Sequence, residues 1–197
     1  RVIKIHPPIQ DVNPAEDRFR PFYRRIAERR IILMVHTGSE YSSDVTDPAL
    51  TDPARLVPAL EEGCTVVAAH SAMGSFLDPR PFREDFFQHL VDLAGRFPKL
   101  YCDTAVLASL FRWRTIPRLL DAPALVGRVI YASDWPFTSN ALVFWNRLNP
   151  GRLLSLCSER NLFERDVRLK RALGLPRDAF ERGAQLLPET RPKAARD

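Results

Sequence analysis

Short runs of apolar residues recur at regular intervals along the chain and predict β-strands. These runs cover residues 2–5, 31–35, 65–69, 100–102 and 129–132. Most of them are continuously apolar, which is typical of parallel strands whose two faces are both covered. A polar turn, or a turn containing glycine or proline, follows each run. The pattern therefore predicts five short, buried, parallel strands.

Helical patterns lie between the predicted strands and after the last of them. Four predicted helices cover residues 19–30, 53–62, 85–97 and 116–125, and three more follow at residues 152–160, 163–173 and 177–187. Their apolar side chains recur at helical spacing on one face, as in helices that pack against a sheet. The segment 116–125 contains Pro117 and Pro123, which interrupt its pattern.

Polar side chains stand at or near the end of each predicted strand, at a nearly constant spacing. They are separated by 31 to 34 residues and are Lys4, His36, His70, Asp103 and Asp134. Strands and helices that alternate at this period are typical of βαβ units in a parallel sheet. Polar groups at the carboxyl ends of the strands favour a (β/α)8 TIM barrel. A doubly wound open sheet is the alternative, but the sequence contains no glycine-rich phosphate loop of the usual kind.

The chain is short for a complete barrel. Eight units need roughly 250 residues, whereas the chain has 197 and offers five strands. We therefore predict an α/β fold of the TIM-barrel type that is incomplete, with about strands 4–8 in residues 1–187. Residues 188–197 are polar and rich in proline and alanine, and we expect a flexible tail there. No second domain is predicted.

Three strand-end residues carry the candidate chemistry. His36, His70 and Asp134 each have a glycine or proline within the next four positions. Imidazole and carboxylate groups are the ligands expected for zinc or another divalent metal. Each residue alone could instead be a hydrogen-bonded structural group or could cap a turn. Together they favour one shared site.

Other polar residues admit two interpretations. Lys4 and His6 could face the barrel interior as metal or substrate contacts, or could only position the chain beside Pro7. Asp103 could support a neighbouring catalytic group or stabilise a turn. Ser71 follows a histidine, but the chain has no GxSxG motif, so a serine hydrolase is poorly supported.

Composition and charge exclude several classes of protein. The chain is 45% hydrophobic with a net charge of +5, which suits a globular domain. No apolar run approaches the roughly 18 residues of a membrane span, and no signal-peptide pattern is present. Three isolated cysteines argue against a disulfide scaffold, so a reducing cytoplasm is expected. Six arginines in residues 18–30 could bind RNA or phosphate, but a solvated helix face is the preferred interpretation.

The ordered set of motifs is similar to that of a known family. The segments are His36-Thr37-Gly38, His70 followed by Gly74, and Ser133-Asp134-Trp135-Pro136. In this order and spacing they resemble the amidohydrolase-related family (amidohydrolase family 2). These proteins are metal-dependent TIM-barrel hydrolases and include decarboxylases of the aminocarboxymuconate-semialdehyde type. Lys4-Ile5-His6-Pro7 looks like the family's fourth strand.

The resemblance implies a role for each residue. His36 would bind the metal, and His70 would activate water or steer the substrate. Asp134 would bind the metal and help to accept a proton. The family's His-x-His pair on its first strand has no counterpart in this chain. We therefore expect the first three strands and this pair to belong to a longer parent protein.

The resulting functional prediction is a metal-dependent hydrolase of small molecules, with a divalent metal, expected to be zinc. Arg112 or Arg114 could hold a substrate carboxylate. A decarboxylase of the related type and a non-catalytic fragment of the same fold are the alternatives. Open strand edges would favour pairing with another copy, so a homo-oligomer is expected. Nucleic-acid and membrane partners are not expected.

Overall fold

A parallel sheet forms the centre of the molecule. The computed structural model describes residues 1–78 and 83–187. In this part of the chain, five strands lie side by side in sequence order: β1 (Val2–Ile5), β2 (Ile32–His36), β3 (Val66–Ala69), β4 (Leu100–Asp103) and β5 (Val129–Ile130). Each neighbouring pair is parallel. The predicted α/β fold of the TIM-barrel type, with five strands, is confirmed, whereas the predicted tail, 188–197, lies outside the described residues.

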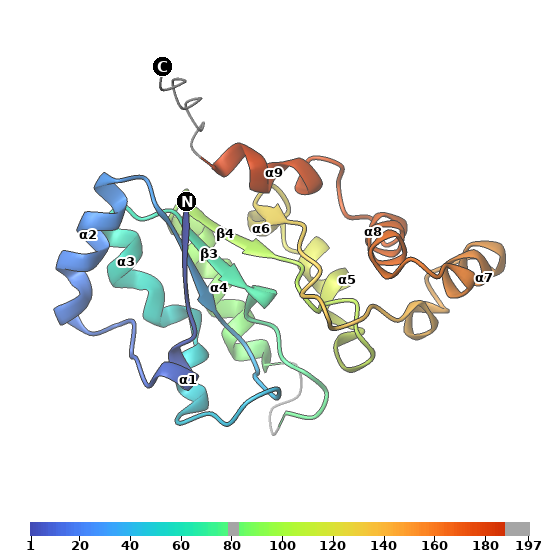
Figure 1. The fold of residues 1–197 in the computed structure, drawn as a ribbon, viewed down its shortest axis with the longest axis horizontal. Coiled ribbons are helices and arrows are strands. Elements are labelled where there is room, and N and C mark those ends of the chain that lie inside the picture. The colour runs from blue at the N-terminus through green and yellow to red at the C-terminus, as the bar shows by residue number, and fades with distance from the viewer. Residues whose placement is uncertain (79–82, 188–197) are drawn as a thin grey trace, which may run out of the picture.

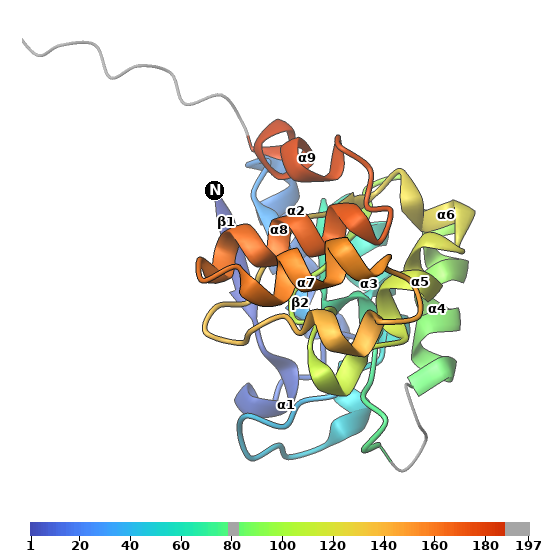
Figure 2. The same cartoon turned by 90° about the vertical axis from the view of Figure 1, so that its right-hand side faces the viewer.

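Helices connect the strands and extend beyond the last one. Their bounds are α1 (Pro7–Gln10), α2 (Arg20–Glu28), α3 (Val57–Glu61), α4 (Glu84–Arg96), α5 (Thr115–Leu120), α6 (Pro123–Val126), α7 (Pro150–Ser158), α8 (Leu162–Ala172) and α9 (Ala179–Leu186). In Figure 1, α2 and α3 flank the β1 side of the sheet, whereas α7 and α8 lie beyond β5. Figure 2 shows α7 and α8 side by side. Helix α9 packs against β5.

The two faces of the sheet differ in what covers them. The register aligns Ile3, Leu33, Val66 and Leu100 in one row across four strands, and this row packs into the hydrophobic core with the helices. Side chains alternate between the faces of a strand, so the adjacent row, Lys4, Met34, Val67 and Tyr101, points to the opposite face. Lys4 is exposed, and Met34 and Tyr101 are half-buried. Full burial of both faces, expected from the continuous apolar runs, therefore holds for β3 but not for β1.

One predicted helix is wrong as a single element. The segment 116–125 is divided into α5 and α6, with Ala122 extended at φ −102° and ψ 96° between them. Pro123 explains the break, because its ring disfavours helical geometry at the preceding residue and supplies no N–H for a helical hydrogen bond. The other predicted helices and strands agree with the structure within a few residues at each end.

The turn after β2 depends on Gly38. This residue has a φ of +79°, and a Cβ atom there would lie 2.3 Å from the carbonyl oxygen of Met73. We expect Gly38→Ala to destabilise the fold by about 3 kcal/mol or more, since backbone strain and a clash with backbone act together. Urea denaturation measures the free energy of unfolding. The control is Gly95→Ala on α4, where nothing lies within 4 Å; equal losses in both variants would contradict this explanation.

The helices of the described part of the chain are all too short or too polar to cross a membrane.

Candidate functional site

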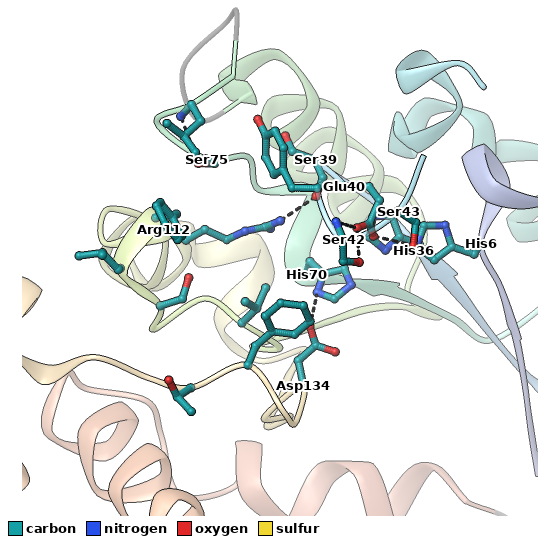
Figure 3. A pocket seen from close by; sticks show the side chains of 18 of the residues that line it. His6, His36, Ser39, Glu40, Ser42, Ser43, His70, Ser75, Arg112 and Asp134 are labelled. Atoms are coloured by element: carbon teal, nitrogen blue, oxygen red, sulfur yellow. Dashed lines mark hydrogen bonds and ion pairs between the residues drawn. The ribbon is translucent and has the colours of Figure 1, made fainter. Parts of the chain in front are cut away.

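The carboxyl ends of the strands open into a pocket of about 800 Å³. The sequence-predicted residues His36, His70 and Asp134 all line it, and so do Lys4 and His6. Figure 3 shows the side chains of His6, His36, His70 and Asp134 converging from separate strands and loops. They meet because the strands are parallel, so all their carboxyl ends reach the same edge of the sheet.

Three imidazole rings form a continuous row in the pocket. The rings of His6 and His36 are stacked with their centroids 3.9 Å apart, and those of His36 and His70 are 4.6 Å apart. Asp134 lies at the His70 end of this row, with its Oδ2 3.8 Å from His70 Nδ1. A second carboxylate, that of Glu40, lies at the His6 end. The row therefore has one acidic group at each end.

Glu40 is the site residue that sequence reasoning missed. Its Oε2 is 2.9 Å from His6 Nε2 and 3.6 Å from His36 Nε2. Its Oε1 accepts hydrogen bonds from the backbone N–H and the hydroxyl of Ser42. Glu40 belongs to the loop after β2, four residues beyond His36, and no strand end marks it. Only its spacing from His36 could have drawn attention to it.

Burial and hydrogen bonds set the protonation states of His36, His70 and Glu40. Burial lowers the pKa of His36 to about 3, with a further contribution from the neighbouring His6, and holds the pKa of His70 well below its usual value. Burial would raise the pKa of Glu40, but hydrogen bonds, above all those from Ser42, outweigh it and bring the pKa to about 2. Neutral imidazoles beside an ionised carboxylate are the forms that bind a divalent cation.

The donor set therefore fits a divalent metal. His6, His36 and Glu40 each offer one ligand atom, and these atoms lie within 4.8 Å of one another. His36 Nε2 is buried without a hydrogen-bond partner, which is costly unless another species, such as a cation, engages the nitrogen. Among the described residues, His6, His36 and Glu40 form the one group of at least three side chains that could hold a metal ion. Asp134 does not belong to this group.

His70 is held in an unusual backbone conformation. His70, Ser71 and Ala72 have φ values of 64°, 52° and 54°. These values lie in the left-handed region, which residues other than glycine rarely adopt. Asp103 stabilises this turn, because its Oδ1 accepts the His70 backbone N–H at 2.8 Å and its carbonyl accepts the Ser71 hydroxyl at 2.6 Å. Of the two interpretations of Asp103, these contacts fit stabilisation of a turn, and the turn that they stabilise carries His70.

We expect Asp103→Ala to destabilise the fold by about 3 kcal/mol, because the buried N–H groups of His70 and Ala105 would lose their acceptor. Asp103→Asn keeps an acceptor oxygen and should cost much less. Urea denaturation of the two variants checks the difference. Equal losses would show that the negative charge of Asp103, and not its acceptor oxygen, stabilises the turn.

The segment that carries Asp134 is anchored from outside the sheet. Lys170 on α8 is fully buried and donates hydrogen bonds of 2.8 Å to the carbonyl of Ala132 and to Asp166. Asp134 itself has a left-handed φ of 63°. Burial raises its pKa, and the positive charge of Lys4 opposes this rise. No pattern in the sequence indicated that a helix after β5 would support the site.

Arg112 also lines the pocket, but its terminal nitrogens are already engaged. They donate hydrogen bonds of 2.8 Å to the carbonyl of Met73 and 2.7 Å to that of Ser39. Arg112 therefore joins the loops after β2 and β3, and its contact with a substrate carboxylate stays a prediction. Arg114 lines a different pocket, beside Trp113 and Arg118.

Comparison with one solved structure shows the fold. An uncharacterized TIM-barrel protein from Bordetella bronchiseptica matches with a TM-score of 0.54 and 18% identity, over 88% of this chain and 58% of that one. A candidate 2-pyrone-4,6-dicarboxylic acid hydrolase from Pseudomonas putida gives 0.49 and 17%, over 89% of this chain and 64% of that one. The chain thus spans less than two thirds of the length of either structure. No curated protein matches it.

A family comparison is more specific. The family model described as amidohydrolase matches residues 1–143. This range includes all five strands and every residue of the row from Glu40 to Asp134. It therefore contains the motifs on which the resemblance was based. The chain belongs to the amidohydrolase family.

Proposed function

We propose that this chain carries the catalytic residues of a metal-dependent hydrolase that acts on a small molecule. The observation that supports the proposal is the convergence of three imidazoles and two carboxylates in one pocket at the carboxyl ends of the strands. A pocket of about 800 Å³ is within the usual range for small-molecule sites. Its lining combines this polar row with apolar side chains, including Ile9, Leu110, Phe111 and Phe137.

The residues of the row have different roles in the proposed reaction. When bound, a divalent ion, expected to be zinc, supplies an acidified water and polarises the bond to be cleaved. His36 helps to hold that ion. His70 is neutral and buried, so it can accept a proton from the attacking water. Asp134 lies 3.8 Å from His70 Nδ1 and stabilises the imidazolium that forms. The second role predicted for Asp134, as a metal ligand, stays a prediction.

Hydrolysis of chromogenic nitrophenyl esters and anilides by the purified chain tests the proposal. We expect turnover with zinc, loss of turnover after chelation, and recovery when zinc is restored. Protein that binds zinc but hydrolyses no ester, amide or lactone would contradict a hydrolase. Release of carbon dioxide from carboxylated substrates would instead favour the decarboxylase alternative.

Three further expectations stay predictions. They are a small-molecule substrate without nucleic-acid or membrane partners, a homo-oligomer and a cytoplasmic location. Within the described sheet, β1 pairs on one side with β2 and β5 pairs on one side with β4. Sedimentation of the purified chain would show whether these open edges bring copies together.

A further inference from the structure

We propose that a groove between α4, α5 and the segment after β5 is a binding site for a small anion that carries a planar ring. The groove has a volume of about 480 Å³, which is within the usual range for small-molecule sites. Of the described residues, none lines both this groove and the pocket that contains His36. The groove is therefore a second site, and its ligand does not depend on the proposed hydrolase function.

Three segments of the chain form the groove. Figure 2 shows α4 and α5 side by side, and residues of the segment 143–147, which follows the last strand, complete the lining. The floor is apolar, because Phe87 on α4 and Phe144 are almost fully buried in the core. A floor of this kind favours a ligand with an apolar surface.

Positive charge gathers at the rim of the groove. Arg114 and Arg118 are four residues apart, and the backbone N–H of Arg118 donates to the carbonyl of Arg114, so both lie on one face of the helical turn that begins α5. Arg147 lines the groove from the segment after β5. Asp121 is the one acidic side chain among the described residues of the lining. Because guanidinium groups stay charged and bind carboxylates and phosphates through paired hydrogen bonds, the rim favours an anion.

Arg118 is held in place but is not fully engaged. It forms an ion pair with Glu84 at the start of α4, and its guanidinium carbon lies 4.9 Å from the centre of the Phe87 ring. Its Nε is nevertheless buried without a hydrogen-bond partner, which is unusual for a buried donor. The guanidinium therefore has a fixed position and an unused donor for an acceptor atom of a ligand.

Trp113 supplies an aromatic surface beside this charge. The residue is 43% exposed, and the guanidinium carbon of Arg114 lies 5.9 Å from the centre of its ring. Planar groups stack on exposed aromatic rings with little dependence on their identity. An aromatic ring next to guanidinium groups thus matches a ligand whose anionic group is attached to a planar ring. Nucleoside monophosphates and aromatic carboxylates are the two sources of such a ligand.

Calorimetric titration of the purified chain with adenosine monophosphate and with benzoate tests the proposal. The chain is treated with a chelator, so that no metal contributes to binding. We expect one molecule of at least one probe per chain, with a Kd below about 1 mM. Phosphate and acetate carry the same anionic groups without a ring, and each should bind at least about 5-fold more weakly than its ring-bearing counterpart. The tighter of the two ring-bearing probes identifies the source of the ligand.

Variants of the groove locate the site. With the tighter probe, Trp113→Ala should weaken binding by about 5- to 150-fold, whereas Trp113→Phe keeps a ring and should retain most of the affinity. Arg147→Gln should weaken binding by about 10-fold. Asp121→Asn removes a repelling charge and should strengthen binding by about 2- to 5-fold. Trp145→Ala and Arg25→Gln, at exposed residues outside the groove, are the matched controls, and circular dichroism verifies folding.

Three results would overturn the proposal. The first is the absence of saturable binding by both ring-bearing probes. The second is unchanged affinity in folded Trp113→Ala and Arg147→Gln, because the probe would then occupy another part of the chain. The third is equal affinity for the anions with and without a ring. None of these measurements needs turnover, so failure of the proposed hydrolase function would leave each of them unchanged.

Discussion

We expect replacement of His70 by asparagine to lower metal-dependent turnover by about 100- to 10,000-fold, the usual contribution of a general base. The His70 imidazole lies between the ring of His36 and the carboxylate of Asp134. Asparagine is chosen because it tolerates the left-handed φ of 64° at this position better than alanine does. The backbone N–H that donates to Asp103 is retained. Steady-state kinetics with the best nitrophenyl substrate measures the effect.

The matched control for this prediction is His89→Asn. His89 lies on α4 and pairs with Asp52, 2.8 Å away, outside the pocket. Its replacement should leave kcat within about 2-fold of the unmodified chain, since it has no part in the proton transfer. If His70→Asn folds, binds metal and retains full turnover, His70 is not the general base.

The second large effect is expected for Lys170→Met, which should destabilise the fold by about 3–5 kcal/mol. The substitution would leave the charge of Asp166 buried and unpaired, since Asp166 is only 5% exposed. The carbonyl of Ala132 would lose its donor as well. Because Ala132 precedes Asp134 by two residues, loss of this hydrogen bond should also disturb the position of Asp134 in the pocket. Urea denaturation measures the free energy of unfolding.

Two variants keep the Lys170 prediction testable. In Lys170→Met with Asp166→Leu, both charges are replaced by apolar groups, and most of the lost stability should return. Lys99→Met is the matched surface control, because Lys99 also donates to a backbone carbonyl, that of Gly63, but is exposed. It should cost less than about 1 kcal/mol. A double variant as unstable as the single one would show that the buried charge is not the cause.

The positions of the strands were predictable because the local apolar pattern of each strand agrees with the regular spacing of the strands along the chain. The apolar runs in β2 and β3 are too short for helices and are followed by turns, and the nearly constant spacing of the polar residues requires a parallel sheet. The prediction failed where a proline that interrupts the helical pattern was noted but a single helix was still expected. Pro123 begins α6 after α5 has ended at Leu120, and the restriction that proline places on the preceding residue keeps Ala122 out of helical geometry.

The candidate site was predictable in outline only. His36 and His70 could be selected because each stands at a strand end, and parallel strands bring such ends to one rim. Glu40 stands in a loop, where no periodicity fixes the direction of a side chain. For His6 the sequence left two interpretations open, and its stacking on His36 decided in favour of the pocket.

By itself, the sequence determined the class of fold, the order of the strands, the family and the edge of the sheet at which the chemistry lies. These follow from short-range patterns, which are repeated in every βα unit. Only the tertiary structure decided which groups touch: that Glu40 meets His6 and His36, that Asp134 meets His70, and that Lys170 secures the segment before Asp134. All of these contacts except that of Glu40 with His36 join residues far apart in the chain. Their geometry depends on loop conformation and burial, which no local pattern encodes.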